Sequence, residues 1–566
     1  MLPTPRLLCL LLCTASAALA DETVTWVTTR DGREVARETA RDEALEGGGR
    51  ALTAVLDASL TPTPWHAEAR LELDAAGRPR AYRLESGTHT LSLQAVPEGL
   101  RLSGTVVGHA LERTFAGEHE PPLVLDNLFW SHYDALGRRA ASRWPSEPAA
   151  DLARVGSFGL TLLVPQAGQL LQGRFTPRPG ERLARQGQTT RRARRGELTV
   201  AALLVQVDLD AEDGRVYRVE VPAQSLLARR QGWELEEMAG GAPGPEQPAA
   251  WREEQLELPG PHGPIGATLC LPRAAGRYPA ALLLPGSGPQ DRDETIGPNK
   301  PLRDLARALA ARGLASLRCD KRTWRLREEV QRAATAEERQ RLLGEQVALG
   351  LEEEYLADAR AAVAWLRQRP EVRPGAVLVI GHSLGALVAP ELASASQAAG
   401  VVLLAGPGRP MIELLEEQLV YQATLAGTPA EQAAAETKRL LDGLRRGLQG
   451  GLGPERVVLG ATIRYWKDVH ARDLPALLRG LSLPVLALAG AEDCQVRPVD
   501  LERLRAALEA RQGAPGQARL LPGRNHLFQA VEGPSTGAEY YRPAPLDPAV
   551  AEAIAAWWRE VGPKDE

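Results

Sequence analysis

The chain has 566 residues, too many for a single hydrophobic core, so two or more domains are expected. Its 44% hydrophobic and 25% charged residues are typical of a globular protein rather than a disordered one. A net charge of −5 gives no electrostatic reason to expect a nucleic acid or an anionic membrane as partner.

The first twenty residues have the pattern of an export signal. Arg6 supplies a positive charge, residues 7–12 form an apolar run, and Ala18-Leu19-Ala20 forms a cleavage site. The apolar run is too short to span a bilayer, and no later run reaches that length. We therefore expect an exported protein, periplasmic or secreted, with no transmembrane segment in the mature chain. An uncleaved anchor is the alternative.

The number and spacing of the cysteines do not indicate a disulfide framework. Cys270, Cys319 and Cys494 remain after the signal, an odd and widely spaced set. None lies in a cluster with metal-ligand spacing, so the sequence predicts no metal site.

Residues 21–237 have the pattern of an antiparallel β domain. Alternating apolar and polar residues run into glycine-containing turns and out again at residues 25–34, 71–84 and 205–219, which predicts three hairpins. One short helix is expected within residues 123–139, with an apolar face of Leu128, Trp130 and Tyr133. The domain could form a curved sheet, and its role is open, including the binding of a ligand or partner.

Residues 238–250 are rich in Gly and Pro and predict a linker. From residue 251 to the C-terminus, continuous apolar runs alternate with helical stretches, which indicates an α/β domain with a mostly parallel sheet and helices on both faces. The runs are residues 280–284, 314–317, 377–380, 401–404 and 485–489.

Two stretches exceed ordinary connection lengths, residues 324–355 and 410–478. Both are rich in charge and helical in pattern. Such helices are often only solvated faces, but inserted after sheet strands they can form a cap over a site. We expect cap insertions here.

The strongest motif is Gly381-His382-Ser383-Leu384-Gly385, which directly follows the apolar run 377–380 and precedes a helical stretch. Strand, G-x-S-x-G, helix is the pattern of a nucleophile elbow, in which glycines leave room for a strained turn. The same pentapeptide recurs at residues 533–537 without a preceding strand. Context therefore selects Ser383 as the nucleophile.

A nucleophilic serine needs a histidine base and a carboxylate that orients it. Asp493 follows the run 485–489, and His526 is the one histidine after it. Their order after Ser383 fits a Ser-Asp-His triad. Glu492 and Asp500 are the alternative acids, while His470 and His382 are expected to be a cap residue and a packing residue.

An oxyanion formed at this serine requires two N–H donors. One is expected from the backbone of Leu384, directly after the nucleophile. The second is expected from the loop 285–289 after the first parallel strand, where we assign Ser287. Gly286 or Gly288 could carry that donor instead.

At this point the sequence resembles bacterial secreted or periplasmic α/β-hydrolases related to dienelactone hydrolases and acyl esterases, over residues 251–566. The resemblance rests on five motifs, at residues 286–293, 320–323, 381–385, 493–496 and 525–528. It implies hydrolysis of a small-molecule or acyl ester through an acyl-enzyme, without a cofactor. Arg292, Asp293, Asp320 and Arg322 are expected to brace the loops by ion pairing.

Tyr421, Tyr465 and Trp466 are candidates for the substrate pocket, with cap core as the equal alternative. Peptidase or amidase action, acyl transfer to another acceptor, and binding without catalysis are the rival functions. A correctly ordered triad argues against the last of these.

Overall fold

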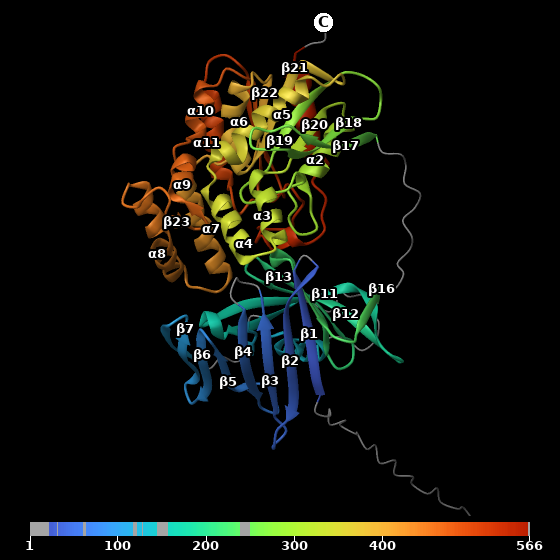
Figure 1. Cartoon of the computed structure of the whole chain (residues 1–566), viewed down its shortest axis with the longest axis vertical. Helices are drawn as coiled ribbons and strands as arrows, with labels where there is room; N and C mark the ends of the chain where they lie inside the picture. The colour runs from blue at the N-terminus through green and yellow to red at the C-terminus, as the bar shows by residue number, and fades with distance from the viewer. Residues whose placement is uncertain are drawn as a thin grey trace, which may run out of the picture.

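The computed structural model describes residues 22–30, 32–59, 64–116, 122–126, 128–143, 157–237 and 250–563. The expected signal segment and nearly all of the expected linker lie outside these ranges. The chain forms a β domain and, beyond residue 250, a C-terminal α/β domain (Figure 1).

The β domain is one sixteen-stranded sheet, antiparallel except for the β9–β10 pair. Its spatial order is β8-β7-β6-β5-β4-β3-β2-β1-β15-β14-β13-β12-β11-β10-β9, and β16 pairs with β11. The strands are β1 (Glu22–Arg30), β2 (Arg33–Ala44), β3 (Arg50–Ala58), β4 (Trp65–Leu73), β5 (Pro79–Ser86), β6 (His89–Val96), β7 (Gly99–Val106), β8 (His109–Ala116), β9 (Leu123–Val124), β10 (Phe158–Val164), β11 (Gln169–Gln186), β12 (Thr189–Val200), β13 (Leu203–Asp210), β14 (Val216–Val221), β15 (Leu226–Arg230) and β16 (Glu234–Glu237).

The three predicted hairpins are confirmed as β1–β2, β4–β5 and β13–β14. The expected helix is shorter than its pattern suggested. Leu123 and Val124 pair with β10, and Leu128 has a φ of 67°, so helical geometry begins only afterwards. The helical part consists of the 3₁₀ turn η1 (Trp130–His132) and α1 (Tyr133–Ala141).

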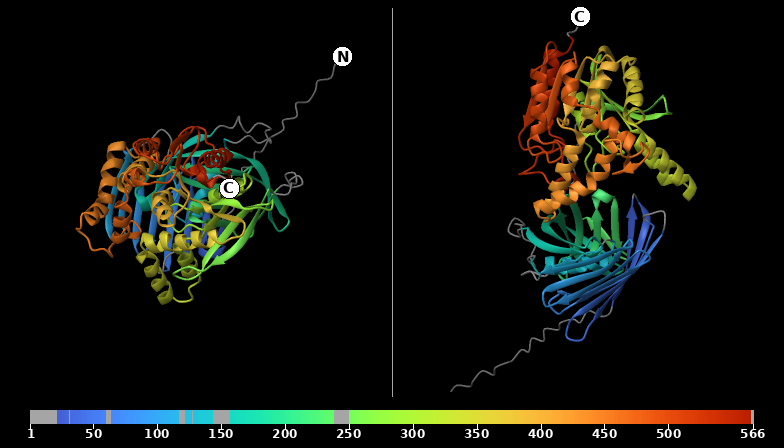
Figure 2. Two further views of the ribbon diagram at one scale, coloured as in Figure 1. Left: turned by 90° about the horizontal axis from the view of Figure 1, so that it is seen from above. Right: turned by 90° about the vertical axis from the view of Figure 1, so that its left-hand side faces the viewer.

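The sheet is strongly curved (Figure 2), and its strands enclose two clusters of buried apolar side chains. Side chains of η1, of α1 and of Phe129 just before η1 join the buried strand residues in two clusters, with Trp130 and Leu136 in one and Phe129 in the other. The helix therefore fills the core of the β domain.

An eight-stranded sheet forms the centre of the C-terminal domain, in the order β17-β18-β20-β19-β21-β22-β25-β26. Five of the strands coincide with the predicted apolar runs, and all pairs from β20 to β26 are parallel. The antiparallel β17–β18 pair at the edge was not predicted. The strands are β17 (Trp251–Leu258), β18 (Ile265–Pro272), β19 (Tyr278–Leu284), β20 (Ala315–Cys319), β21 (Val372–His382), β22 (Gly400–Leu404), β25 (Val485–Gly490) and β26 (Gly516–Leu521).

Helices cover both faces of this sheet and bury its apolar residues. One face is covered by α2 (Pro301–Ala310) and α12 (Pro548–Val561). The other is covered by α5 (Ala357–Arg367), α6 (Leu384–Ala395), α10 (Leu474–Gly480) and α11 (Pro498–Glu509).

Further helical segments follow β20 and β22, within the two stretches expected to form a cap. None of the helices that the structure describes is long and apolar enough to cross a membrane. The segments are α3 (Arg322–Arg332), α4 (Ala336–Ala348), the π-helical turn η5 (Glu352–Leu356), α7 (Met411–Leu425), α8 (Ala430–Leu448), the short strands β23 (Val457–Val458) and β24 (Ala461–Thr462), and α9 (Ile463–His470).

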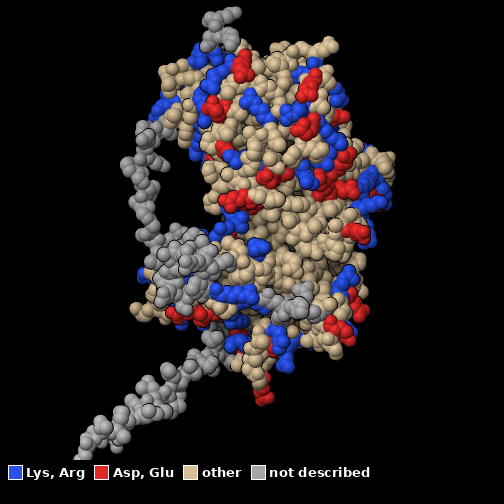
Figure 3. Space-filling model, turned by 180° about the vertical axis from the view of Figure 1, so that it is seen from behind, with Lys and Arg blue, Asp and Glu red and all other residues tan. Residues whose placement is uncertain are grey.

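The two domains touch through the cap and through the loop before α12. The backbone N–H of Gln172 in β11 donates to the carbonyl of Ala426 at the end of α7, at 3.2 Å. The Arg542 guanidinium, after η6 (Ala538–Tyr541), donates to Glu197 in β12 at 2.8 Å. Seen from behind, basic and acidic side chains are interspersed over the C-terminal domain (Figure 3).

Candidate active site

Ser383 occupies a strained turn between β21 and α6. Its φ of 52° and ψ of −118° are unusual for a residue with a side chain. A Cβ added to Gly381 would lie 2.3 Å from the carbonyl oxygen of Gly385, and one added to Gly385 would lie 2.6 Å from that of Leu284. The two glycines are therefore required by close backbone approach, as the elbow motif predicts.

The structure places Asp493 and His526 side by side. The Asp493 carboxylate follows β25 and accepts a hydrogen bond from His526 Nδ1 at 2.7 Å. It also accepts from the backbone N–H groups of Gln495 and Val496, at 2.7 and 2.9 Å. Both side chains are buried. With Nδ1 donating to the carboxylate, Nε2 is the ring atom that can take a proton.

The alternative acids and base lie elsewhere. Asp500 is buried against Arg409, with an oxygen 2.8 Å from its guanidinium. Glu492 has no hydrogen bond to His526 among the contacts of the described chain. His470 is exposed at the end of α9. Asp493 is thus the carboxylate that orients His526.

Among the described residues, the Ser383 hydroxyl has no hydrogen-bond partner. Ser383, Asp493 and His526 nevertheless follow strands β21, β25 and β26, whose carboxyl ends meet at one edge of the sheet. Ligand sites of open α/β sheets form at this edge. Contacts between nucleophile and base commonly tighten only when substrate binds.

The loop after β19 is held by three buried groups. The Gly286 N–H donates to Glu294 Oε1 at 2.6 Å, so it is engaged and unsuited to bind an oxyanion. The Gly286 carbonyl accepts from Lys321 Nζ at 3.2 Å and from the Tyr355 hydroxyl at 2.6 Å. In a trans peptide the following N–H points the opposite way, so the Ser287 N–H faces away from Lys321.

The first N–H groups of a helix have no partner within it, and Leu384 begins α6. A Cβ on Gly286 would lie 3.2 Å from the Ser383 Cβ, so the loop lies directly against the elbow. The geometry is therefore suited to oxyanion binding by the N–H groups of Ser287 and Leu384. Of the two alternatives, Gly286 is disfavoured and Gly288 is still open.

His382 links this loop to the loop of His526. Its Nδ1 lies 2.9 Å from Glu294 Oε1, and its Nε2 lies 3.0 Å from the carbonyl oxygen of His526. Both partners are acceptors, so both ring nitrogens carry protons. Burial lowers the pKa of His382, but the Glu294 carboxylate and the His526 carbonyl outweigh it, and the pKa lies above its ordinary value.

Comparisons with known proteins show the family of the chain. The model of the Alpha/beta hydrolase family matches residues 340–536. Esterase EstD of Thermotoga maritima is 35% identical over 310 residues, which cover 55% of this chain and 68% of that protein. The chain belongs to the α/β-hydrolase family. Its fold class is thereby confirmed, with the antiparallel β domain preceding the hydrolase domain.

Solved structures with the same fold are more distant. Est1E from Butyrivibrio proteoclasticus is 15% identical with a TM-score of 0.34, covering 54% of this chain and 98% of that one. A dienelactone hydrolase from Anabaena variabilis is 17% identical with a TM-score of 0.30, covering 55% and 99%. A puromycin-hydrolyzing peptidase of Mycobacterium tuberculosis is 16% identical with a TM-score of 0.37, covering 92% and 70%. Such low values carry no information about activity.

The expected ion pairs around the hydrolase site are present. Arg292 pairs with Asp320 at 2.5 Å, Asp293 pairs with Arg318 at 2.8 Å, and Arg322 pairs with Asp358 at 2.7 Å. None of these groups faces the serine across the cavity. They brace the loops that follow β19 and β20.

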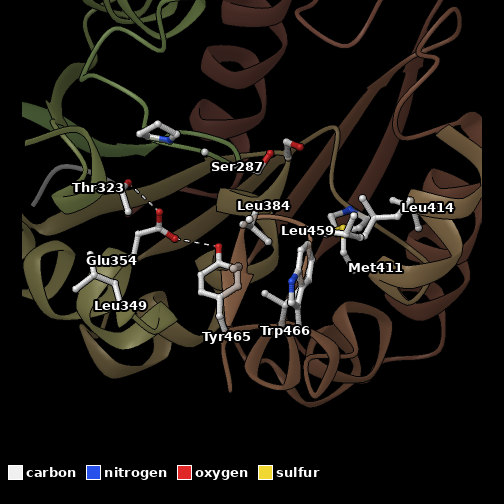
Figure 4. A pocket seen from close by; sticks show the side chains of 18 of the residues that line it. Ser287, Thr323, Leu349, Glu354, Leu384, Met411, Leu414, Leu459, Tyr465 and Trp466 are labelled. Atoms are coloured by element: carbon white, nitrogen blue, oxygen red, sulfur yellow. Dashed lines mark hydrogen bonds between the residues drawn. The ribbon is translucent and has the colours of Figure 1, made fainter. Parts of the chain in front are cut away.

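A cavity of about 320 Å³ lies between the elbow and the cap helices of the hydrolase domain (Figure 4). Ser287, Ser383 and Leu384 line it, together with the predicted pocket residues Tyr465 and Trp466. Tyr421 lies in a different hollow beside Asp493, where its hydroxyl donates to the Ser535 carbonyl at 2.8 Å. It faces that hollow because it lies on the side of α7 that contacts the loop 533–537.

The second G-x-S-x-G copy is a loop, as its context indicated. Ser535 is buried and its hydroxyl donates to Glu539, which leaves it no nucleophilic role. The groups that sequence reasoning missed are Lys321, Glu354 and Glu294. Only Lys321 carried a signal, since it lies within the motif 320–323.

Proposed function

We propose that this hydrolase cleaves carboxylic esters through an acyl-enzyme, with Ser383 as nucleophile, His526 as base and Asp493 as the group that orients His526. One observation carries the proposal: the strained Ser383 elbow shares a sheet edge with the buried His526–Asp493 pair. The esterase relative, of which the chain covers 68%, supports ester bonds as the substrate class.

Acylation begins when the Ser383 oxygen bonds to the ester carbonyl carbon and its proton passes to His526 Nε2. The Ser287 and Leu384 N–H groups stabilise the oxyanion, each contributing about a hundredfold or more to the rate. The bond to the alcohol oxygen then breaks. The departing alcohol takes the proton from His526 and leaves the acyl group on Ser383.

Deacylation reverses these roles. His526 removes a proton from water, and the resulting oxygen nucleophile attacks the acyl carbonyl. The bond to Ser383 breaks, the acid departs, and the serine recovers its proton from His526. The steps use only side chains and backbone groups of this chain.

The test is hydrolysis of para-nitrophenyl butyrate by the wild type, Ser383→Ala and Ser535→Ala, with folding checked by circular dichroism. Loss of a triad serine costs about 10⁴-fold or more in kcat, so Ser383→Ala should be nearly inactive. Ser535→Ala is the matched control from the second motif and should retain ester hydrolysis. Retained turnover in folded Ser383→Ala would contradict the proposal.

The rival reactions give different products. Faster cleavage of the matching butyranilide than of the ester would favour an amidase. Formation of a new ester with added alcohol, in place of butyric acid, would favour acyl transfer.

A further inference from the structure

The cavity beside Ser383 has two unlike sides (Figure 4). One side is apolar, with Trp466, Leu459 and Met411 facing the space. The other carries the polar groups of Thr323 and Glu354, and Tyr465 lies between the two sides. Thr323 lies in α3, Glu354 in the π-helical turn η5 and Tyr465 in α9, so the polar side is built from three separate segments.

Lys321 lies behind this polar side and has no donor left for the cavity. Its ammonium group is within hydrogen-bond distance of Gly286 O at 3.2 Å, of the Tyr355 hydroxyl at 2.8 Å and of Glu354 Oε1 at 3.0 Å. A lysine has three donor protons, and these three partners account for all of them. Lys321 is buried and does not line the cavity.

The Glu354 carboxylate is only partly satisfied. Oε1 accepts from Lys321 and from the Thr323 hydroxyl, which lies 2.9 Å away. Oε2 accepts from the Tyr465 hydroxyl, also at 2.9 Å. A carboxylate has roughly four acceptor positions, so one position on Oε2 stays open. The side chain is 4% exposed, and its residue lines the cavity.

The hydroxyl groups of Thr323 and Tyr465 also have only acceptor positions open. Thr323 and Tyr465 have each given their only proton to Glu354, and each keeps lone pairs. Every unfilled hydrogen-bonding position on Glu354, Thr323 and Tyr465 is therefore an acceptor. A ligand group that pairs with these three side chains must donate.

We propose that Glu354, Thr323 and Tyr465 form a subsite for a hydroxyl group of the ester substrate, remote from the bond that is cleaved. The inference rests on the proposed ester hydrolysis and specifies its substrate class. The substrate is an ester with an apolar body, held against Trp466 and Leu459, and one hydroxyl that donates to the polar side.

A hydroxyl fits better than an ammonium group. The charge of Glu354 is already balanced by Lys321, so a second cation would add an uncompensated charge to a largely enclosed space. A neutral donor fills the open acceptor position without that cost. A substrate lacking the hydroxyl would leave a buried carboxylate oxygen unpaired, which is the kind of defect that enzymes use to reject analogues.

The experiment compares kcat/KM for matched ester pairs. One pair consists of the para-nitrophenyl esters of hydroxyphenylpropanoic acid and of its methyl ether. A second pair carries the hydroxyl or methoxyl group on a phenylethyl alcohol esterified with butyrate, so that either end of the substrate can present it. A third compound replaces the hydroxyl by an aminomethyl group.

We expect the wild type to prefer the hydroxyl compound by about 10- to 100-fold in one of the two pairs, as for a hydrogen bond to a charged group. Thr323→Val and Tyr465→Phe should each reduce that preference at least threefold, because each removes an acceptor. Leu459→Ala, on the apolar side, should lower kcat/KM for both members equally and leave their ratio unchanged.

A ratio of kcat/KM for hydroxyl over methoxyl substrate near one in both pairs would overturn the inference. So would a ratio that neither Thr323→Val nor Tyr465→Phe reduces. A preference for the aminomethyl compound over the hydroxyl compound would overturn it as well. Ser383-dependent hydrolysis of para-nitrophenyl butyrate distinguishes this failure from a failure of the proposed function. If simple esters are cleaved without hydroxyl preference, only the subsite is wrong. If no ester is cleaved, both proposals fall.

Discussion

His132 in the β domain and His382 in the hydrolase domain are both buried, but their surroundings differ. His132 lies in the core of the β domain with no exposed surface, and neither ring nitrogen has a hydrogen-bond partner among the described residues. It stacks on Phe129, with ring centroids 5.5 Å apart. Burial lowers its pKa to about 3. His382 is 4% exposed, but both of its nitrogens are partnered and its pKa is raised.

The difference shows that partners, rather than burial, separate a histidine that only packs from one that joins two loops. Without partners, burial makes the neutral ring the stable form, and His132 serves as an aromatic side chain of the core. With a carboxylate and a carbonyl as partners, His382 has a raised pKa and joins the loops of Gly286 and His526.

The largest effect is expected at the carboxylate that orients His526. Asp493→Asn should lower kcat for ester hydrolysis by about 10⁴-fold, because the imidazole loses its orientation and its charge partner. Two controls are Glu492→Gln, at the neighbouring position, and His132→Phe, in the other domain. Neither residue hydrogen-bonds to His526 in the described part of the chain, so each variant should keep kcat within about twofold of the wild-type value. An Asp493→Asn enzyme as active as these controls would contradict the triad.

A smaller loss is expected at His382. His382→Phe removes both hydrogen bonds and lets the His526 loop shift, and a displacement of about 1 Å costs on the order of a hundredfold in rate. His382→Gln keeps a donor toward the His526 carbonyl and should recover part of kcat, with KM little changed in both variants. Equal losses in the two variants would argue that His382 only fills space.

The charge of His382 also makes a pH prediction. Its folded-state pKa is raised, so its contribution to stability is complete below the unfolded value of 6.5 and is lost as pH rises through the folded value. As pH rises, the melting temperature of the wild type should therefore decrease relative to that of His382→Gln. The difference in melting temperature between wild type and His382→Gln should change as pH rises and become constant at high pH. A difference that is the same at every pH would contradict the raised pKa of His382.

In the β domain, His132 and Glu38 should change the stability of the protein in opposite directions as pH rises. Burial raises the pKa of Glu38 to about 7, although hydrogen bonds from Ser131 and Trp130 lower it. A raised carboxyl pKa means that stability is lost as pH rises from 4.5 to about 7, by about 1.4 kcal/mol per pH unit. The lowered pKa of His132 means that stability is lost, at about the same slope, as pH falls from 6.5 to about 3.

The two slopes can be separated by denaturant unfolding of the full-length protein at several pH values. As pH rises from 4.5 to 7, the free energy of unfolding of Glu38→Gln should increase relative to that of the wild type by about 1.4 kcal/mol per pH unit. As pH falls from 6.5 toward 3, the free energy of unfolding of His132→Phe should increase relative to that of the wild type by a similar amount per pH unit. Parallel stability curves for wild type and variant would contradict the assigned protonation states.

The sequence predicted those parts of the molecule that rest on local pattern. The elbow follows from a strand, two glycines and a helix that are adjacent in the chain, and the parallel strands follow from runs that are apolar at every position. The contact between Asp493 and His526 could be predicted because each follows a strand in the expected order. The partners of Gly286 could not be found this way, because Lys321 and Tyr355 lie 35 and 69 residues away along the chain.

The same limit explains the remaining misses. Glu354 meets Tyr465 across 111 residues, and no local pattern marks either as polar lining of a cavity. Tyr421 has the same residue type and helical setting as Tyr465, yet it faces the loop 533–537 instead. Only the packing of α7 and α9 distinguishes the two tyrosines.

The central claim, an activated serine at position 383, is tested most directly by fluorophosphonate labelling read by intact mass. We expect one adduct on the wild type, none on Ser383→Ala, and one on Ser535→Ala. A label that persists in Ser383→Ala, or well-folded wild-type protein that hydrolyses esters yet takes no label, would contradict the assignment of Ser383 as the nucleophile.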